Sequence, residues 1–553
     1  GPAIENGFYY DIDFGAEKIS DADLPKLEAS MRKHLSEWKN FTSQEVSKDA
    51  AMAAFSTPAG ANPYKTELIG EIEGRGEKIT LYSCGGFTDL CRGGHAEHPS
   101  EDIAPDSFAL DRVAGAYWRG DEKNPMLTRI YGLAFDTKEE LDAYKAQREE
   151  AKKRDHRKLG KELELFTIID EIGPGLPLFY PKGALLRRTI ENYITDLQES
   201  RGYVPIWIPH ITKGELYEIS GHLQKYDAMY SPMKVDEEDY YLKPMNCPHF
   251  MMLYRTLPHS YRQLPLRYTS TTTNYRYEKS GELSGLTRVR ALTQDDCHVF
   301  CTPEQIEGEI TLMTEMIGEV YRTFGFEDFW VRISLRDSKN KEGYLGGDAV
   351  WNTAEDALRT VMKKTGWQYQ EVENEAAFYG PKLDFMLKDA LGREWQLSTI
   401  QLDFNLPKRF ELEYTDMEGK KAQPVVIHRA ILGSTERFMG IMIEHYAGAF
   451  PLWLSPVQAR VLPVSEKHAA YAQEVLSALK AANIRADVGE ANESLGKKIR
   501  AAKTEKIPYL LVVGDKEVES KTVSIDSRDH GKIDALPLTD FIARATEEIK
   551  TRK

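Results

Sequence analysis

The sequence of 553 residues has few cysteines and no long apolar run. Its five cysteines show no regular spacing, which favours a reducing compartment over a disulfide framework. No stretch approaches the roughly 20 apolar residues that a membrane helix requires. The first residues, GPAIENGFYYDID, lack the basic and apolar regions of a secretion signal. These absences argue against a secreted or membrane protein and predict a cytoplasmic location with no membrane contact.

Internal repeats and low-complexity segments are also missing. The composition, 41% hydrophobic and 29% charged, is that of an ordinary globular protein. A net charge of −15 opposes nucleic-acid binding by charge over the whole surface, but it permits a local basic face. A chain of this length is expected to form about three domains.

The pattern of the sequence changes at three points. Residues 1–137 mix short apolar runs with glycine-rich turns, which predicts an α+β domain. Residues 138–163 are densely charged and predict a connecting helix, whose basic cluster at 152–158 fits a solvated face or, alternatively, a nucleic-acid contact. Residues 164–453 alternate helical patterns with strand-like runs such as KLDFMLK, which predicts an antiparallel sheet flanked by helices. Residues 454–553 alternate strands and helices, as in an α/β domain with a largely parallel sheet.

Three residues of the type that binds zinc lie in separate segments, KPMNCP, TQDDCHVF and VIHRAILGSTERF. They are Cys247, His298 and His428. A Cys/His/His set leaves the fourth tetrahedral position open, which distinguishes catalytic from structural zinc, and the wide spacing excludes a zinc finger. Cys297 precedes His298, but neighbours in a strand face opposite sides, so we expect Cys297 to be a buried thiol.

An arginine and a carboxylate followed by a glycine-containing loop predict a triphosphate site. The segment YRYE contains Arg276 and Glu278, the loop SGELSGL follows it, and Arg288 lies just downstream. The segment GSTERF adds a Gly-Ser turn and Arg437. Small residues allow the backbone to approach a ligand closely, and a pair of arginines stabilises charge that develops on phosphates.

Together these segments resemble the threonyl-tRNA synthetases, a family of class II aminoacyl-tRNA synthetases, along essentially the whole chain. YRYE is similar to the second class II motif, GSTERF to the third, and residues 202–209 to the first, which builds the dimer interface in that family. The resemblance implies a multidomain α+β fold. Its parts are a partial N-terminal editing-type domain, an antiparallel catalytic sheet of six to seven strands flanked by helices, and a C-terminal α/β anticodon-binding domain.

The activity implied by the resemblance is ATP-dependent activation of L-threonine and its transfer to the 3′ end of threonine tRNA by a homodimer. The implied cofactors are Mg²⁺ with ATP and one zinc ion per subunit, held by Cys247, His298 and His428. Zinc would select a hydroxyl amino acid, since valine cannot chelate it through an amine and a hydroxyl. Serine offers the same two atoms, and losing one methyl costs only about 1–3 kcal/mol, so the family needs an editing site.

The resemblance also assigns roles to individual residues. The residues nearest the reacting groups are Arg276, Lys382 and His222. Those for ATP are Arg276, Glu278, Arg288, Gln396, Thr399, Ser434 and Arg437. Those for threonine are Gln294, Asp296, Tyr379, Gln401 and Met245.

Cys91 and His95 match half of the family's editing site. The other half is a histidine pair that lies upstream of the GFYYDID-like segment in the family. This chain begins directly after the position where that pair would be expected. We therefore expect this chain to retain an editing remnant and to have lost editing of serine-mischarged tRNA. Without the resemblance, a Cys and a His four residues apart also fit a metal pair, or a loop thiol beside a surface imidazole.

The C-terminal segment carries positions that match anticodon contacts, namely Asn492, Lys506 and Glu517. Two residues depart from the family pattern, Asp526 in this segment and Leu292 in residues 164–453. Asp526 stands where relatives can carry an arginine, and a carboxylate cannot make the bidentate contact of arginine with guanine. Leu292 stands where relatives often place an aromatic ring against adenine, and it would stack less well.

Three alternatives remain open at the level of sequence. A prolyl-type class II synthetase would share the sheet and the anticodon domain, but it has no use for a zinc ion that reads a hydroxyl. A non-catalytic, synthetase-like RNA-binding regulator would be expected to lack motif arginines or metal ligands, and none is missing. A zinc hydrolase is disfavoured because the sequence has no HExxH segment.

Overall fold

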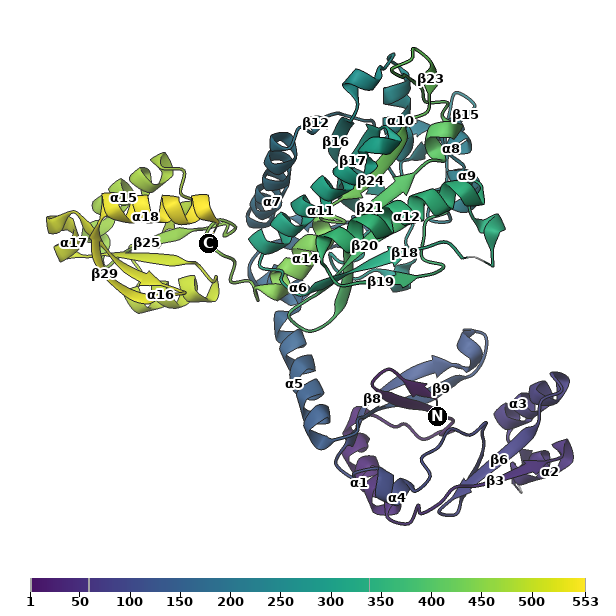
Figure 1. Ribbon diagram of the computed structural model, residues 1–553. Helices are drawn as coiled ribbons and strands as arrows, with labels where there is room; N and C mark the ends of the chain where they lie inside the picture. The colour runs from purple at the N-terminus through teal and green to yellow at the C-terminus, as the bar shows by residue number, and fades with distance from the viewer. Residues whose placement is uncertain (1, 58–59, 338, 553) are drawn as a thin grey trace. The chain divides into compact units, whose positions relative to one another are not determined.

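The computed structural model describes residues 2–57, 60–337 and 339–552. The chain divides into two compact units, the first ending at Glu150 and the second starting at Ala151 (Figure 1). Among the described helices, none is long and apolar enough to cross a membrane. The finer domain boundaries expected at residues 137, 163 and 453 remain predictions.

Besides the two-residue pair of β4 (Ser56–Thr57) and β5 (Gly60–Ala61), the first unit contains two antiparallel sheets. The larger has the order β1-β2-β9-β8, and the smaller has the order β3-β6-β7. Helices α2 and α3 pack on the smaller sheet and bury Ala51, Ile69 and Ile79. The strands are β1 (Ala3–Ile4), β2 (Gly7–Ile12), β3 (Thr42–Val46), β6 (Ile79–Cys84), β7 (Phe87–Leu90), β8 (Phe108–Tyr117) and β9 (Met126–Ala134), and the helices are α1 (Leu24–Leu35), α2 (Lys48–Ala54) and α3 (Pro63–Gly74).

The charged segment expected to be one connecting helix forms two helices, α5 (Lys138–Arg154) and α6 (His156–Glu162). Asp155 interrupts them with non-helical dihedrals, φ −48° and ψ 119°. Its carboxylate accepts the Arg157 N–H at 2.8 Å and so caps the start of α6. The prediction of one helix is therefore wrong. Charge density alone could not reveal the break, because aspartate suits both a helix surface and an N-cap.

An eight-stranded sheet with the order β12-β16-β17-β24-β21-β20-β18-β19 forms the centre of the second unit. The six inner strands pair antiparallel, whereas both edge strands pair parallel to their neighbours. The sheet therefore has eight strands, of which the six inner ones are antiparallel, instead of the six to seven antiparallel strands expected. The strands are β12 (Val204–Pro205), β16 (Leu266–Tyr275), β17 (Ala291–Cys301), β18 (Phe329–Ser334), β19 (Tyr369–Val372), β20 (Lys382–Lys388), β21 (Glu394–Asp403) and β24 (Val425–Ala430).

Alternate residues separate the two faces of this sheet, as the two-residue period of a strand requires. On β17, Cys297 and Val299 belong to the main apolar core, to which α6 and four longer helices contribute. Asp296 and His298 belong to the opposite face. Cys297 is thus a buried core thiol, as the strand period predicted. The longer helices are α7 (Pro181–Ser200), α11 (Ile306–Thr323), α12 (Asp348–Thr365) and α14 (Thr435–His445), and Figure 1 shows α11 and α12 lying across the strands.

The C-terminal segment forms a five-stranded sheet with the order β26-β25-β27-β28-β29. The first three strands are parallel, as expected, while β28 and β29 add an antiparallel edge. The elements are β25 (Ala459–Pro463), α15 (Ala469–Ala481), β26 (Ala486–Val488), α16 (Leu495–Thr504), β27 (Tyr509–Val513), α17 (Asp515–Ser520), β28 (Thr522–Ser527), β29 (Gly531–Pro537) and α18 (Leu538–Thr551).

Candidate active site

Cys247, His298 and His428 come together although they are far apart in the sequence. One potential ligand atom of each lies within 4.8 Å of those of the other two, and all three side chains are buried. His298 and His428 face each other across β17 and β24, and Cys247 is the first residue of α10 (Cys247–Arg255). Strand register and one helix start therefore bring the three residues together.

The hydrogen bonds around these residues fit a metal site. Neither nitrogen of the buried His298 ring has a hydrogen-bond partner among the described residues. His428 instead shares its Nε2 with Asp403 Oδ2 at 3.0 Å, which leaves its Nδ1 for another ligand. Two neutral imidazoles and a cysteine thiolate are a donor set that zinc prefers. Burial lowers the pKa of His298, which favours the neutral ring that a metal requires.

A row of polar side chains continues from the ligands across the sheet. Gln401 lies opposite His428, and Lys382 lies opposite Gln401. Asp296, two residues before His298, accepts a hydrogen bond from Asn246 Nδ2 at 2.9 Å. These residues were predicted from separate motifs, and the register of β17, β24, β21 and β20 brings them onto adjacent strands.

Three arginines with the predicted phosphate role lie close together. Arg437 is fixed by donating hydrogen bonds to the backbone carbonyls of Thr287 at 3.0 Å and Gln396 at 3.2 Å. Burial, followed by the guanidinium groups of Arg276 and Arg288, lowers the pKa of Arg437. Like charges that crowd one another in this way form a site where an anion is favourable.

Asp384 was missed by sequence reasoning. Its fully buried carboxylate accepts hydrogen bonds from the side chains of five residues. The donors are Ser334 at 2.7 Å, Lys382 at 2.8 Å, Gln396 at 2.7 Å, Thr399 at 3.1 Å and Arg332 at 3.2 Å. Three of these, Lys382, Gln396 and Thr399, were predicted site residues. The segment KLDF gave no local signal that its aspartate would organise its neighbours.

Other predicted residues lie in the same part of the second unit. Gln294 accepts from Asn274 and donates to the carbonyl of Gly433, while the Ser434 hydroxyl caps α14 by accepting the Arg437 N–H at 3.1 Å. The Tyr379 ring lies 5.5 Å from that of His428. Of the remaining residues, Glu278 accepts from Arg288 at 3.0 Å, His222 is buried and bonds Ser220 at 2.7 Å, and Met245 packs against the cluster containing Cys247 and Phe250.

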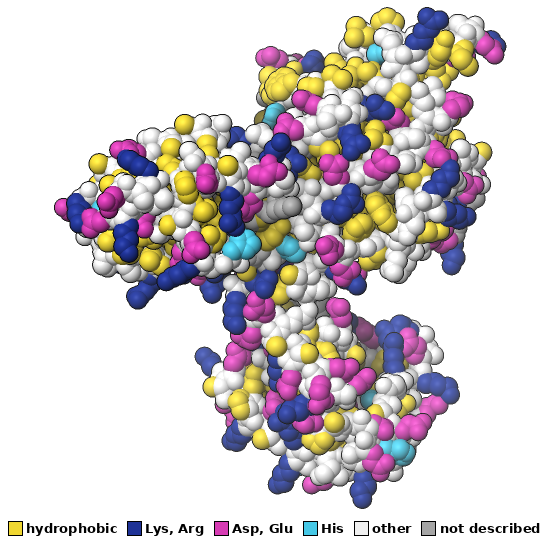
Figure 2. All heavy atoms as spheres, turned by 60° about the vertical axis from the view of Figure 1, so that its left-hand side comes forward, with side chains coloured by type: hydrophobic (Ala, Val, Ile, Leu, Met, Phe, Trp, Pro, Cys, Tyr) yellow, Lys and Arg dark blue, Asp and Glu magenta, His cyan; other side chains and the backbone are white. Residues whose placement is uncertain are grey.

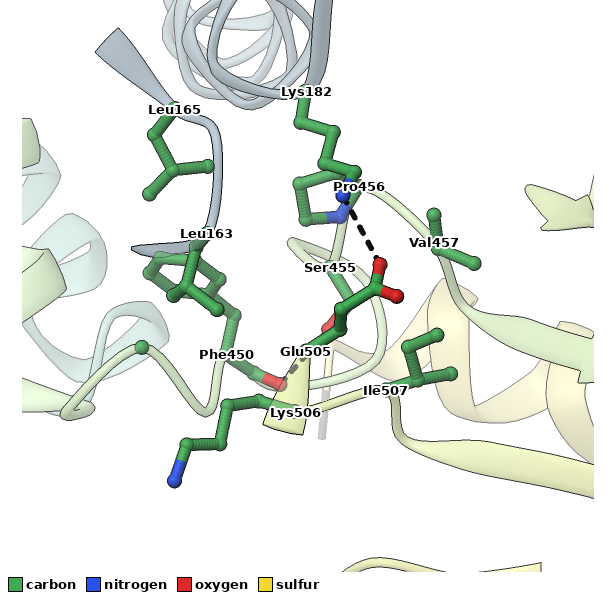
Figure 3. Close-up of a pocket in the computed structure, with 11 residues that line it drawn as sticks. Leu163, Leu165, Lys182, Phe450, Ser455, Pro456, Val457, Glu505, Lys506 and Ile507 are labelled. Carbon is green, nitrogen blue, oxygen red and sulfur yellow. Dashed lines mark hydrogen bonds and ion pairs between the residues drawn. The ribbon is translucent and has the colours of Figure 1, made fainter. Parts of the chain in front are cut away.

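The predicted anticodon residues occupy different surroundings. Asn492 is exposed in a turn, and Glu517 accepts hydrogen bonds from the Gly514 N–H and the Ser524 hydroxyl. Lys506 lines a small pocket in which Lys182 pairs with Glu505 at 3.0 Å, and its ammonium group points away from the other side chains (Figure 3). On the face drawn in Figure 2, acidic and basic side chains are interspersed without a continuous basic surface.

Cys91 and His95 lie in the first unit in an aromatic and acidic environment. The His95 ring stacks on Phe41 at 4.1 Å and meets Tyr82 edge-on at 4.9 Å. Asp89, two residues before Cys91, accepts hydrogen bonds from the Tyr10 hydroxyl and the Lys65 ammonium group. Asp89, Tyr10 and Lys65 were not singled out in the sequence, because they come from three separate segments.

Comparison with known proteins identifies both parts of the second unit. Residues 230–446 match the tRNA synthetase class II core domain (G, H, P, S and T), and residues 458–548 match an anticodon binding domain. The chain is 49% identical over 556 residues to the threonine–tRNA ligase of Rubrobacter xylanophilus, covering all of this chain and 85% of that protein. It is also 49% identical over 562 residues to the threonine–tRNA ligase of Thermus thermophilus, covering 84% of it.

A solved structure gives the same answer. The RNA binding domain of threonyl-tRNA synthetase from Cryptosporidium parvum is similar with a TM-score of 0.69 and 38% identity. The match covers 71% of this chain and 98% of that one. The resemblance inferred from the motifs is thereby confirmed.

Proposed function

The chain belongs to the threonine–tRNA ligase family of class II aminoacyl-tRNA synthetases, and from this premise we propose that Cys247, His298 and His428 hold the zinc ion by which the enzyme selects threonine. The observation that carries the proposal is the convergence of these three buried ligands, within electrostatic reach of Arg276 of the arginine cluster. A class II synthetase activates its amino acid with ATP and Mg²⁺ and then charges tRNA.

The donor set supports the metal assignment. The His298 nitrogens have no hydrogen-bond partner among the described residues, so their burial is costly unless a ligand satisfies them. Asp403 fixes the tautomer and the ring orientation of His428. When bound, zinc offers an open position that distinguishes an amine with a neighbouring hydroxyl from an apolar isostere.

For ATP, we assign the triphosphate to Arg276, Arg288 and Arg437. Their guanidinium groups carry the charge that must balance the phosphates, and Arg437 is held in place by two backbone carbonyls before any ligand arrives. Preorganised positive charge stabilises the negative charge that develops as pyrophosphate leaves. Glu278, Gln396, Thr399 and Ser434 complete the predicted ATP site.

For the amino acid, we assign Asp296 to accept the hydroxyl proton of threonine. Asn246 orients this carboxylate by donating to Oδ2, and Oδ1, which lies 3.6 Å from His298 Nδ1, would accept the substrate hydroxyl. Gln294, Tyr379, Gln401 and Met245 would form the walls of the pocket. A site that uses its own polar groups to read a hydroxyl rejects an analogue lacking it by about 10⁴–10⁵-fold, far more than an apolar pocket achieves.

At the reacting end, we assign Arg276 to bridge the threonine carboxylate and the α-phosphate. Lys382 adds a second positive charge, oriented by its 2.8 Å contact with Asp384. Burial lowers the pKa of His222 to about 4, so its ring is neutral near pH 7 and can accept or donate a hydrogen bond. These residues position and stabilise charge, and none acts as a covalent nucleophile.

We further propose a homodimer formed through residues 202–209. Trp207 is 79% exposed and Val204 is 50% exposed, which is unusual for large apolar side chains beside an edge strand. For the tRNA we retain Asn492, Lys506 and Glu517 as anticodon contacts. Cys91 and His95 remain candidates for editing residues in the first unit.

The decisive experiment is ATP–pyrophosphate exchange with threonine, serine, valine and proline, before and after metal removal and zinc restoration. We expect strong exchange with threonine, weaker exchange with serine and almost none with valine or proline, and all of it should require zinc. Exchange with threonine that is indifferent to metal would contradict the zinc assignment. Exchange that is strongest with proline would contradict the substrate.

A further inference from the structure

A buried histidine outside the substrate pocket links three segments of the second unit. His156, in α6, is only 4% exposed and lies between the loop that follows YRYE and the helix α14. With Asp155 and Glu444 it forms a group whose potential ligand atoms lie within 4.8 Å of one another. The group therefore has to be judged as either a second metal site or a hydrogen-bond relay.

The hydrogen bonds favour a relay. The backbone N–H of Leu286 donates to His156 Nε2 at 3.0 Å, so Nε2 is unprotonated and the proton resides on Nδ1. Nδ1 then donates to Glu444 Oε1 at 2.6 Å. Both ring nitrogens are thus satisfied without an ion. Asp155 is also occupied, because its carboxylate caps α6 and binds the Arg157 guanidinium group.

Glu444 extends the relay to the turn between β20 and β21. Its second oxygen accepts from Arg393, which lies in the turn between β20 and β21 and also pairs with Asp389 at 2.7 Å. Although burial acts to raise the pKa of Glu444, hydrogen bonds from His156 and Arg393 outweigh it and leave the pKa below its usual value. Glu444 is therefore an ionised acceptor that fixes the His156 ring from behind.

The other end of the relay reaches the phosphate arginines within two residues. Leu286 is fully buried, and the carbonyl of the next residue, Thr287, accepts the hydrogen bond from Arg437 Nε. Arg288 follows directly and pairs with Glu278. Moving the Leu286 amide would therefore displace both an acceptor of Arg437 and the backbone that carries Arg288.

Gly285 shows how closely the loop is pressed onto the histidine. Its φ is +46°, and a Cβ atom built there would lie 2.1 Å from His156 Nε2 and 2.8 Å from Arg157 Cγ. A side chain at this position would push the loop away from α6. Gly281, in the same loop, has nothing within 4 Å of such a Cβ and gives a matched control.

We propose that His156 is a positioning residue for ATP, which holds the loop carrying Thr287 and Arg288 through the Leu286 N–H and is itself held by Glu444. The proposal rests on the assignment of Arg288 and Arg437 to ATP. It gives the connecting segment, whose charge pattern indicated a solvated face or a nucleic-acid contact, a role in shaping the nucleotide site.

The test compares His156→Gln with His156→Asn. Glutamine can place an amide oxygen near the position of Nε2 and accept from Leu286, whereas the shorter asparagine reaches only the Nδ1 position. We expect His156→Asn to raise the KM for ATP about tenfold, the equivalent of one lost hydrogen bond, with the KM for threonine within twofold of wild type. His156→Gln should stay within about threefold of wild type for both substrates.

Gly285→Ala should reproduce the rise in the KM for ATP, and Gly281→Ala should not. Equal effects of the Gln and Asn variants, or parallel changes in both KM values, would overturn the proposal. So would a second equivalent of bound metal that is lost in the His156 variants.

Hydrogen–deuterium exchange of the ligand-free protein provides a readout that does not depend on activity. The peptide containing Leu286 should exchange faster in His156→Asn than in His156→Gln, and unchanged protection in both would contradict the proposal. If the wild-type protein shows no threonine-dependent exchange of pyrophosphate, the proposed function fails, and the deuterium experiment still decides the role of His156.

Discussion

His298 and His428 lie directly opposite each other on the antiparallel strands β17 and β24, with ring centroids 4.4 Å apart. Side chains of directly opposed residues share one face of a sheet, so this pairing alone brings two imidazoles within reach of one ion. Cys247, the first residue of α10, completes the set of three ligands. The sheet register is thus the main determinant of the candidate zinc site.

The zinc assignment predicts that Cys247→Ser loses the metal and at least about 100-fold of threonine-dependent exchange activity. Mutation of residues that only hydrogen-bond a metal ligand typically costs about 10–100-fold in activity, and loss of a ligand itself should cost more. Elemental analysis and pyrophosphate exchange measure the two losses. Asp403→Asn should weaken zinc affinity by about 10–100-fold. Cys297→Ser is the control, since Cys297 lies in the core and should leave the zinc content unchanged. Loss of zinc from this control would count against the assignment.

The arginine cluster predicts a large kinetic defect for Arg276→Ala. We expect the rate of exchange to fall by about 10²–10³-fold, as for removal of one preorganised charge-stabilising group. Arg201→Ala serves as the control, because Arg201 forms a partly exposed pair with Glu319 and should change the rate little. A defect of less than about threefold in Arg276→Ala would remove this residue from the reacting site.

Asp384 predicts coupled losses of stability and activity. Asp384→Asn removes the carboxylate partner of Lys382 and leaves Arg332 with Glu375 alone, and we expect the free energy of unfolding to fall by about 3–5 kcal/mol. Urea unfolding measures this change, and pyrophosphate exchange should fall with it. Ser334→Ala removes one neutral donor to the same carboxylate and should cost only about 1 kcal/mol. Similar costs for the two variants would show that charge is not the main contribution of Asp384.

Lys243 predicts a pH dependence of stability on the alkaline side. Burial lowers its pKa to about 8 from the ordinary 10.5. The unfolded chain therefore binds more protons between these values, and the free energy of unfolding rises with pH across that window. Relative to Lys243→Met, the wild-type protein should gain roughly 1–2 kcal/mol between about pH 8 and pH 9.5 in urea unfolding. Parallel pH profiles for the two proteins would contradict a lowered pKa.

The dimer proposal predicts that Trp207→Glu dissociates the protein. A charge at a desolvated apolar contact is unfavourable, so sedimentation should show a monomer at concentrations where the wild type is a dimer. Met417→Glu is the matched control, because Met417 is 81% exposed in the turn after β22 (Tyr414–Thr415). A wild-type monomer, or dissociation by both variants, would exclude residues 202–209 as the specific interface.

Strand and helix patterns predicted much of the second unit. The strand-like run KLDFMLK forms β20 over its full length. The alternation of strands and helices in residues 454–553 predicted the three parallel strands. The strand-like run YVPIWI, residues 203–208, contains the edge strand β12, but only Val204 and Pro205 of that run pair with β16. The break at Asp155 could not be predicted, because aspartate occurs both at N-caps and on helix surfaces.

By itself, the sequence determined the residue types of the candidate site and the segments that contain them, because zinc ligands, phosphate-binding arginines and glycine turns are chemically distinctive. Only the tertiary structure decided which residues hold these groups in place. Asp384 with Lys382, Asp403 with His428, and Glu444 with His156 are contacts made through sheet register and helix packing. A polar group that is buried away from water must form a hydrogen bond within the protein. Its partner can come from any part of the chain, so only the tertiary structure determines which residue it is.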